Sequence, residues 1–161
     1  MNAAQRFNRL MNRVYDRLRH EQAFIVASRW DDGSTAPLST LGRRTYALLI
    51  TFRRTGEPVP SPVWFAHDGD AVVVRTFADS GKVKRIGNDP RVLIAPATMR
   101  GRPKGTTLRA TARLLPQEEW SRAEEALERA YGLGRRLYEG AVGEPDETVA
   151  YLELLPAPSS S

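Results

Sequence analysis

Short stretches of apolar and β-branched residues, separated by turn signals, dominate the chain from Tyr46 onward. Such stretches are typical of β-strands, in which successive side chains alternate between two faces. Six strands are expected: a pair joined by a turn at 55–58, a third at 71–77 after a hairpin turn at 67–70, and then 91–98, 106–115 and 148–155. The elements lack a strand–helix–strand rhythm, which argues against a Rossmann fold.

The strand expected at 106–115 has the clearest alternation of apolar residues. Every even position from Leu108 to Leu114 is apolar, with Ala110 and Ala112 between them. Because side chains two apart lie on the same face of a strand, these four residues are expected to share one buried face.

Helices are expected at two places among the strands. Ser80 is a good N-cap for a short helix that ends before Pro90. Pro116 begins a longer helix whose apolar stripe runs to Tyr131, and Gly132 ends it. A second short helix is expected at 133–139.

The chain divides into three parts. Residues 45–155 form one strand-rich domain, preceded by a helix and extension at 1–44 and followed by a disordered tail at 156–161. Apolar residues at steps of three and four predict an amphipathic, basic helix over 3–19. Such a helix can lie on a membrane or in a partner's groove, but it more often covers its own domain or a twin subunit.

The residues after the third strand form the strongest candidate for a binding site. Ser80-Gly81-Lys82-Val83-Lys84-Arg85 combines a helix cap, a glycine and three cations, and it holds two of the three lysines in the chain. Free backbone N–H groups and the positive end of the helix dipole favour an anion at such a place. The spacing therefore predicts a phosphate site, with a solvated basic turn as the alternative.

Composition excludes several kinds of chemistry. The 161 residues contain no cysteine, so disulfides, iron–sulfur clusters and thiol nucleophiles are excluded. The two histidines, His20 and His67, fall in different elements, and no metal site is expected. No apolar run has the length of a membrane span and no secretory signal is recognisable, so a soluble cytoplasmic protein is expected.

The net charge of +5 admits two interpretations. A basic surface attracts nucleic acid through its phosphates. The cations are scattered over the chain, however, and no nucleic-acid-binding motif accompanies them. An acidic small ligand is the favoured interpretation, and no nucleic acid partner is expected.

Several blocks resemble the split β-barrel oxidoreductases that use the deazaflavin coenzyme F-420, relatives of the pyridoxamine-phosphate-oxidase-like flavoproteins. The blocks are YALLITFRRTGEPVPSPVWF at 46–65, SGKVKRI at 80–86, NDPRV at 88–92 and Arg100-Gly101-Arg102. The resemblance runs from about Tyr46 to Leu155. It implies a mainly β fold with helices (α+β), a six-stranded split barrel of the FMN-binding type, and a homodimer with the coenzyme groove at its interface.

The resemblance also implies coenzyme contacts at ten positions. The backbone of Pro62, Val63, Trp64 and Phe65 would flank the deazaflavin ring. The side of the coenzyme that carries the ribityl phosphate would meet Arg75, Thr76, Ser80, Gly81, Lys82 and Arg85. From the residues alone, Trp64 is a core side chain by default, since its neighbours Val63 and Phe65 are apolar on the other face.

The implied activity is hydride transfer between the deazaflavin and a small conjugated organic substrate. The coenzyme performs that chemistry. No side chain stands out as an acid or base, so the sequence assigns no catalytic residue. Two alternatives stay open: an FMN-dependent oxidoreductase of the same fold, and a non-catalytic protein that holds a coenzyme or a tetrapyrrole such as biliverdin or haem.

Overall fold

A computed structural model describes residues 29–43, 46–99, 102–142 and 149–158 of the protein. The amphipathic helix expected at 3–19 lies outside these residues, and so do Arg100 and Gly101.

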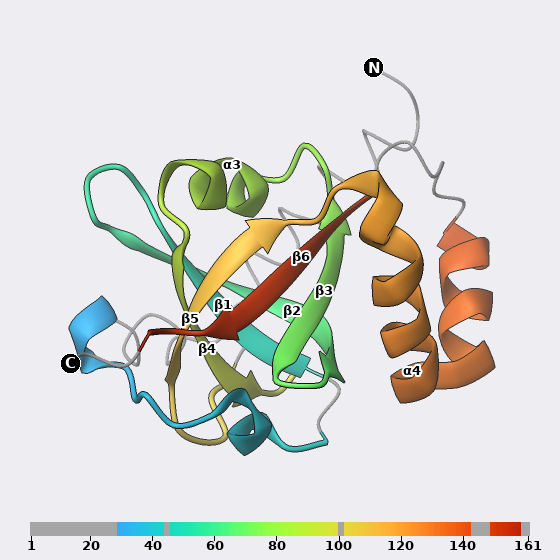
Figure 1. Cartoon of the computed structure of the whole chain (residues 1–161), viewed down its shortest axis with the longest axis horizontal. Helices are drawn as coiled ribbons and strands as arrows, with labels where there is room; N and C mark the ends of the chain where they lie inside the picture. The colour runs from blue at the N-terminus through green and yellow to red at the C-terminus, as the bar shows by residue number, and fades with distance from the viewer. Residues whose placement is uncertain (1–28, 44–45, 100–101, 143–148, 159–161) are drawn as a thin grey trace.

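Six antiparallel strands of the described chain close into a barrel (Figure 1). In chain order they are β1 (Tyr46–Phe52), β2 (Pro58–Asp68), β3 (Ala71–Phe77), β4 (Arg91–Ala97), β5 (Leu108–Leu114) and β6 (Val149–Pro156). Around the barrel they pair in the order β1-β2-β3-β6-β5-β4, and β4 pairs again with β1. The predicted six-stranded barrel with helices is confirmed.

Short helical segments close both ends of the barrel core. Helix α3 (Gly81–Asn88) crosses one end and inserts Ile86 among the apolar residues inside. The 3-10 turn η2 (Leu38–Leu41) inserts Leu38 and Leu41 into the same core. In Figure 1, α3 lies above the strands and η2 below them. The core is therefore covered at its two open ends by elements that lie outside the sheet.

A second 3-10 turn, η1 (Trp30–Asp32), packs against the outside of the barrel. Trp30 covers an apolar cluster on β1 and β4, and the guanidinium groups of Arg91 and Arg109 lie 5.9 and 5.7 Å from its ring. The chain then passes very close to β4 and β5 at Gly33. A Cβ on Gly33 would lie 2.6 Å from the Cδ2 atom of Leu93, so this path requires glycine.

Helix α4 (Trp120–Val142) lies on the outer face of the barrel and is preceded by the 3-10 turn η3 (Gln117–Glu119). Gly132 has φ 62° and ψ −149°, a conformation outside the helical region, and the helix turns back there into a second arm (Figure 1). Ala123, Ala126 and Leu127 are buried against side chains of the sheet. The predicted break at Gly132 is confirmed.

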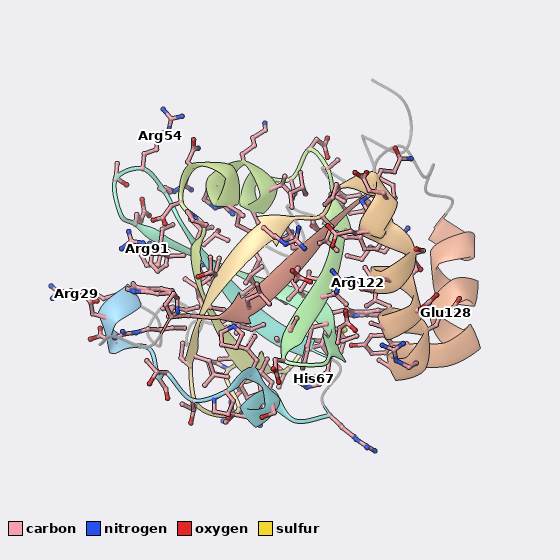
Figure 2. All side chains as sticks on the ribbon, viewed as in Figure 1. Arg29, Arg54, His67, Arg91, Arg122 and Glu128 are labelled. Carbon is pink, nitrogen blue, oxygen red and sulfur yellow. The ribbon has the colours of Figure 1, made fainter. Side chains whose placement is uncertain are left out.

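An ion-pair network fixes α4 to the barrel. Arg122, which points from α4 toward the strands in Figure 2, donates to Glu153 Oε2 of β6 at 2.7 Å and also pairs with Asp68 at the end of β2. Arg113 Nε of β5 donates to Glu153 Oε1 at 2.9 Å, and Glu119 contacts both arginines. Because the Glu153 side chain is only 6% exposed, loss of these partners would leave a buried charge.

This network predicts a loss of stability in acid. Burial raises the pKa of Glu153, but the hydrogen bonds and charges of Arg122 and Arg113 outweigh that effect and hold the pKa below its ordinary value of 4.5. A carboxylate with a lowered pKa in the folded state stabilises the protein above its unfolded pKa. The free energy of unfolding, measured by urea titration, should therefore fall as the pH drops below about 4.5. In Glu153→Gln, the free energy of unfolding should depend less on pH in this acid range. The matched substitution of an exposed carboxylate, Glu125→Gln, should leave that pH dependence unchanged.

The end of β5 departs from the alternation read from the sequence. Leu108, Ala110 and Ala112 are buried as expected, but Leu114 is 51% exposed and Leu115 is buried instead. The chain leaves the strand at this point, where the Leu115 N–H donates to the Tyr151 carbonyl at 2.9 Å. The prediction of a buried Leu114 is wrong because Leu114 is the last residue of β5, where burial inside the barrel ends, whereas Leu115 lies just beyond the strand and packs under α4.

The first half of β2 has an edge without donors. Residues 58–64 pair with β1, whereas only 65–68 pair with β3. The Arg53 N–H donates to the Glu57 carbonyl at 2.9 Å, and bonded pairs alternate along an antiparallel ladder. Pro58, Pro60 and Pro62 therefore fall at the positions whose backbone groups point away from β1. Proline has no N–H, so this edge offers carbonyl oxygens at those three residues.

Candidate functional site

On two strands, the side chains that face the barrel interior are apolar until the last one, which is a threonine. Both threonines lie at the end of the barrel that α3 covers. On β1 these side chains run from Ala47 through Leu49 to Thr51, and on β3 the corresponding row ends at Thr76. The two threonines are 1% and 8% exposed. A buried hydroxyl needs a hydrogen-bond partner, so each threonine is expected to contact a polar side chain of the element that covers this end of the barrel.

Helix α3 supplies those partners with its two half-buried cations. Lys82 Nζ donates to Thr76 Oγ1 at 3.0 Å, and Arg85 Nε donates to Thr51 Oγ1 at 2.6 Å. Lys82 is thus anchored to β3 and Arg85 to β1. Each cation is held against the rim of the barrel by a hydroxyl group that carries no charge.

The first turn of α3 has the geometry of an anion seat. Ser80 is the N-cap, as predicted, with extended backbone at φ −69° and ψ 151°, but its side chain makes no capping bond. Ser80 Oγ is buried and has no hydrogen-bond partner among the described residues. A Cβ on Gly81 would lie 2.7 Å from Nη1 of Arg85, so the guanidinium folds back over the start of the helix.

These residues fit a phosphate group. The seat contains an orphaned buried hydroxyl, two cations and the N-terminal N–H groups of an eight-residue helix, all of which can donate to an anion. Asp79, the carboxylate just before the cap, is exposed. Proteins rarely leave a buried polar atom unsatisfied, so a bound group such as a phosphate would complete the hydrogen bonding of the Ser80 hydroxyl.

Arg75 lies apart from this seat. Its side chain projects outward from β3, and Arg75 Nε lies 3.8 Å from Glu124 Oε1 on α4. The buried Tyr151 hydroxyl donates to the same carboxylate. The sequence correctly placed Arg75 and Thr76 on opposite faces of their strand, and the structure brings Thr76, not Arg75, to Lys82.

The four residues expected beside the ring divide between the two faces of β2. Val63 and Phe65 are buried in the barrel core. Trp64 projects outward, where its ring lies 6.0 Å from Tyr46 and 5.5 Å from Tyr131 of α4. Trp64 is thus not a core side chain of the barrel, and it belongs to a half-buried aromatic cluster on the outer face. Pro62 carries one of the carbonyl groups that point away from β1.

Thr51 is the site residue that the sequence did not single out. A signal was present, because the apolar alternation Ala47, Leu49 is continued by a hydroxyl just before the hairpin turn. Its significance depends on Arg85, which is 34 residues away in the chain.

Two other features are absent from the described part of the chain. No group of three or more His, Asp or Glu residues there is arranged to hold a metal ion. None of the helices it contains is both long and apolar enough to cross a membrane.

Comparison with known sequences places the chain in a family. A family model for pyridoxamine 5'-phosphate oxidase matches residues 38–154, a stretch that runs from η2 into β6 and includes α3 and both threonines. The chain belongs to the pyridoxamine 5'-phosphate oxidase family. No curated protein sequence matches it.

Solved structures share the barrel of this pyridoxamine 5'-phosphate oxidase family member at low identity. HutZ, the heme storage protein from Vibrio cholerae, is 17% identical with a TM-score of 0.56, over 74% of this chain and 86% of that one. A FAD-binding protein from Mesorhizobium loti is 12% identical with a TM-score of 0.54, over 73% and 83%. An F-420 reductase is 20% identical with a TM-score of 0.50, over 74% and 93%. Identities this low show a common fold.

Proposed function

We propose that this protein is an oxidoreductase that binds a phosphorylated flavin-type coenzyme, the deazaflavin F-420, with the coenzyme phosphate at the start of α3. The observation that carries the proposal is the buried Ser80 hydroxyl without a hydrogen-bond partner at the start of that helix, where the Arg85 guanidinium folds back beside Gly81 and Lys82 follows in the same turn. Membership of the pyridoxamine 5'-phosphate oxidase family supports a flavin-type coenzyme. The blocks SPVWF and SGKVKRI favour the deazaflavin.

In this proposal the chain's residues bind and orient. Lys82 and Arg85 neutralise the phosphate charge, and the hydroxyl of Ser80 and the N–H groups of the first helical turn donate to its oxygens. The ring lies along residues 62–65, next to the aromatic cluster of Tyr46, Trp64 and Tyr131. A second subunit closes the groove in a homodimer, and a small conjugated molecule is the substrate. When bound, a reduced deazaflavin supplies the hydride that such a substrate accepts.

Exposed cations near α3 support a coenzyme that carries an acidic tail. Lys84 is exposed on the helix itself. Arg54, at the tip of the β1–β2 hairpin, donates to Asn88 Oδ1 at the end of α3 at 3.0 Å and is also exposed. Together they add two exposed positive charges along α3, and such charges attract carboxylates over several ångströms.

Titration of the purified protein with each coenzyme tests the proposal. We expect the deazaflavin to bind more tightly than FMN, with a preference that shrinks as salt rises, because exposed charges are screened. Absorbance and fluorescence measure both affinities. The reduced deazaflavin should then be oxidised by a conjugated acceptor only when protein is present.

Other outcomes would select a different function. Equal affinity for FMN and deazaflavin at low salt contradicts the deazaflavin assignment and leaves the phosphate site in place. Tight binding of haem or biliverdin without binding of either coenzyme contradicts the oxidoreductase proposal.

A further inference from the structure

Arg85 occupies an electrostatically unfavourable position. Its guanidinium lies at the first turn of α3, close enough that Nη1 is 2.7 Å from the place where a Cβ of Gly81 would be. The N-terminal end of a helix carries partial positive charge, so a cation there is repelled by the helix itself. An arginine stays at such a place only if another contact holds it.

Thr51 provides one such contact. Its hydroxyl accepts from Arg85 Nε at 2.6 Å and lies 3.5 Å from the Val59 carbonyl, to which it can donate. Thr51 is 1% exposed in the wall of the barrel, so its position is fixed by the sheet. The Nε–H of Arg85 is used by this bond, and a bidentate contact with a phosphate would accordingly use Nη1 and Nη2.

From these contacts we propose that Thr51 is a positioning residue that sets Arg85 in its anion-binding orientation before a ligand arrives, and that Gly81 is required to leave room for the guanidinium. An arginine side chain has much conformational freedom, and fixing it beforehand reduces the entropy lost on binding. The inference rests on the proposed function, because it assigns the phosphate of the coenzyme to Arg85.

Four variants test the role of Thr51. Thr51→Val keeps the shape of the side chain and removes the acceptor, so the dissociation constant for FMN, used as the phosphate-bearing probe, should rise about fivefold. Thr51→Ser keeps the hydroxyl and should restore binding. Arg85→Ala should weaken binding more strongly, by about 10- to 100-fold, and adding Thr51→Val to it should have no further effect. Additive losses in the double variant would overturn the inference.

Gly81→Ala separates a role of Gly81 in anion binding from a role in folding alone. The three nearest atoms to the added methyl group all belong to the flexible end of Arg85, so the guanidinium should move while the helix gains a better helix former. We expect weaker FMN binding with an unchanged or higher melting temperature. A variant that binds as tightly as the wild type contradicts the requirement for glycine.

A measurement without coenzyme separates this inference from the proposed function. In the free protein, the Arg85 Nε–H should exchange slowly with solvent in nuclear magnetic resonance spectra. That protection should be lost in Thr51→Val and kept in Thr51→Ser. Rapid exchange in the wild type would overturn the positioning role, whereas slow exchange together with no binding of FMN or deazaflavin would contradict the proposed function alone.

Discussion

Replacing Lys82 by alanine is expected to weaken coenzyme binding about 10- to 100-fold while the barrel stays folded. A hydrogen bond from a charged donor to phosphate contributes about 1.5–3 kcal/mol, and Lys82 is one of the two cations at the seat. Its hydrogen bond to Thr76 Oγ1, at 3.0 Å, lies at the rim of the barrel and outside the apolar core. The dissociation constant for the deazaflavin and the melting temperature measure the two effects.

Two substitutions serve as controls for Lys82→Ala. Lys104 is exposed on the loop after β4, and Lys104→Ala removes the same charge from a different part of the surface. Arg129 on α4 lies 3.6 Å from Asp68 and is 62% exposed, so Arg129→Ala should also leave binding almost unchanged. If Lys82→Ala binds the coenzyme as the wild type does, the phosphate site at α3 is refuted.

Replacing Leu41 by alanine should lower the free energy of unfolding by about 2–5 kcal/mol, the usual cost of removing a large aliphatic side chain from a core. Leu41 is 1% exposed and reaches the barrel interior from η2. The residue lies at the end of the core opposite α3, so the loss should appear in urea denaturation without a matching loss of phosphate affinity.

Leu114→Ala is the matched control for the core substitution. It removes the same atoms from a leucine that is 51% exposed, and such surface changes usually alter stability by less than about 0.5 kcal/mol. If Leu41→Ala and Leu114→Ala have similar effects, η2 does not contribute to the closure of the barrel.

The sequence predicted those elements whose signals are local. The valine-rich stretch at 71–77 is the observed β3, because a strand that is covered on both faces is apolar along most of its length. Val72 and Val74 lie in the barrel core, and Val73 packs under α4. Ser80 marks the start of α3 and Gly132 the break in α4, since the first takes extended backbone before a helix and the second a positive φ. These features depend on a few neighbouring residues.

Contacts between distant parts of the chain could not be predicted from local sequence patterns. Alternation placed Arg75 and Thr76 on opposite faces, but only the fold shows that Glu124 of α4 faces the arginine. The bond between Thr51 and Arg85 joins β1 to α3, and no local pattern specifies it. Leu115 is buried because α4 packs over it. The alternation of side chains along the strand contains no information about that helix.

The proline edge of β2 limits how two barrels can associate. A continuous sheet between subunits needs N–H donors from both edge strands, and Pro58, Pro60 and Pro62 provide none at the three positions that face outward. Two molecules that meet along this edge must therefore bind through side chains and keep their sheets separate. Because this edge lacks donors, it is also a poor template for the edge-to-edge strand pairing by which proteins aggregate into fibres.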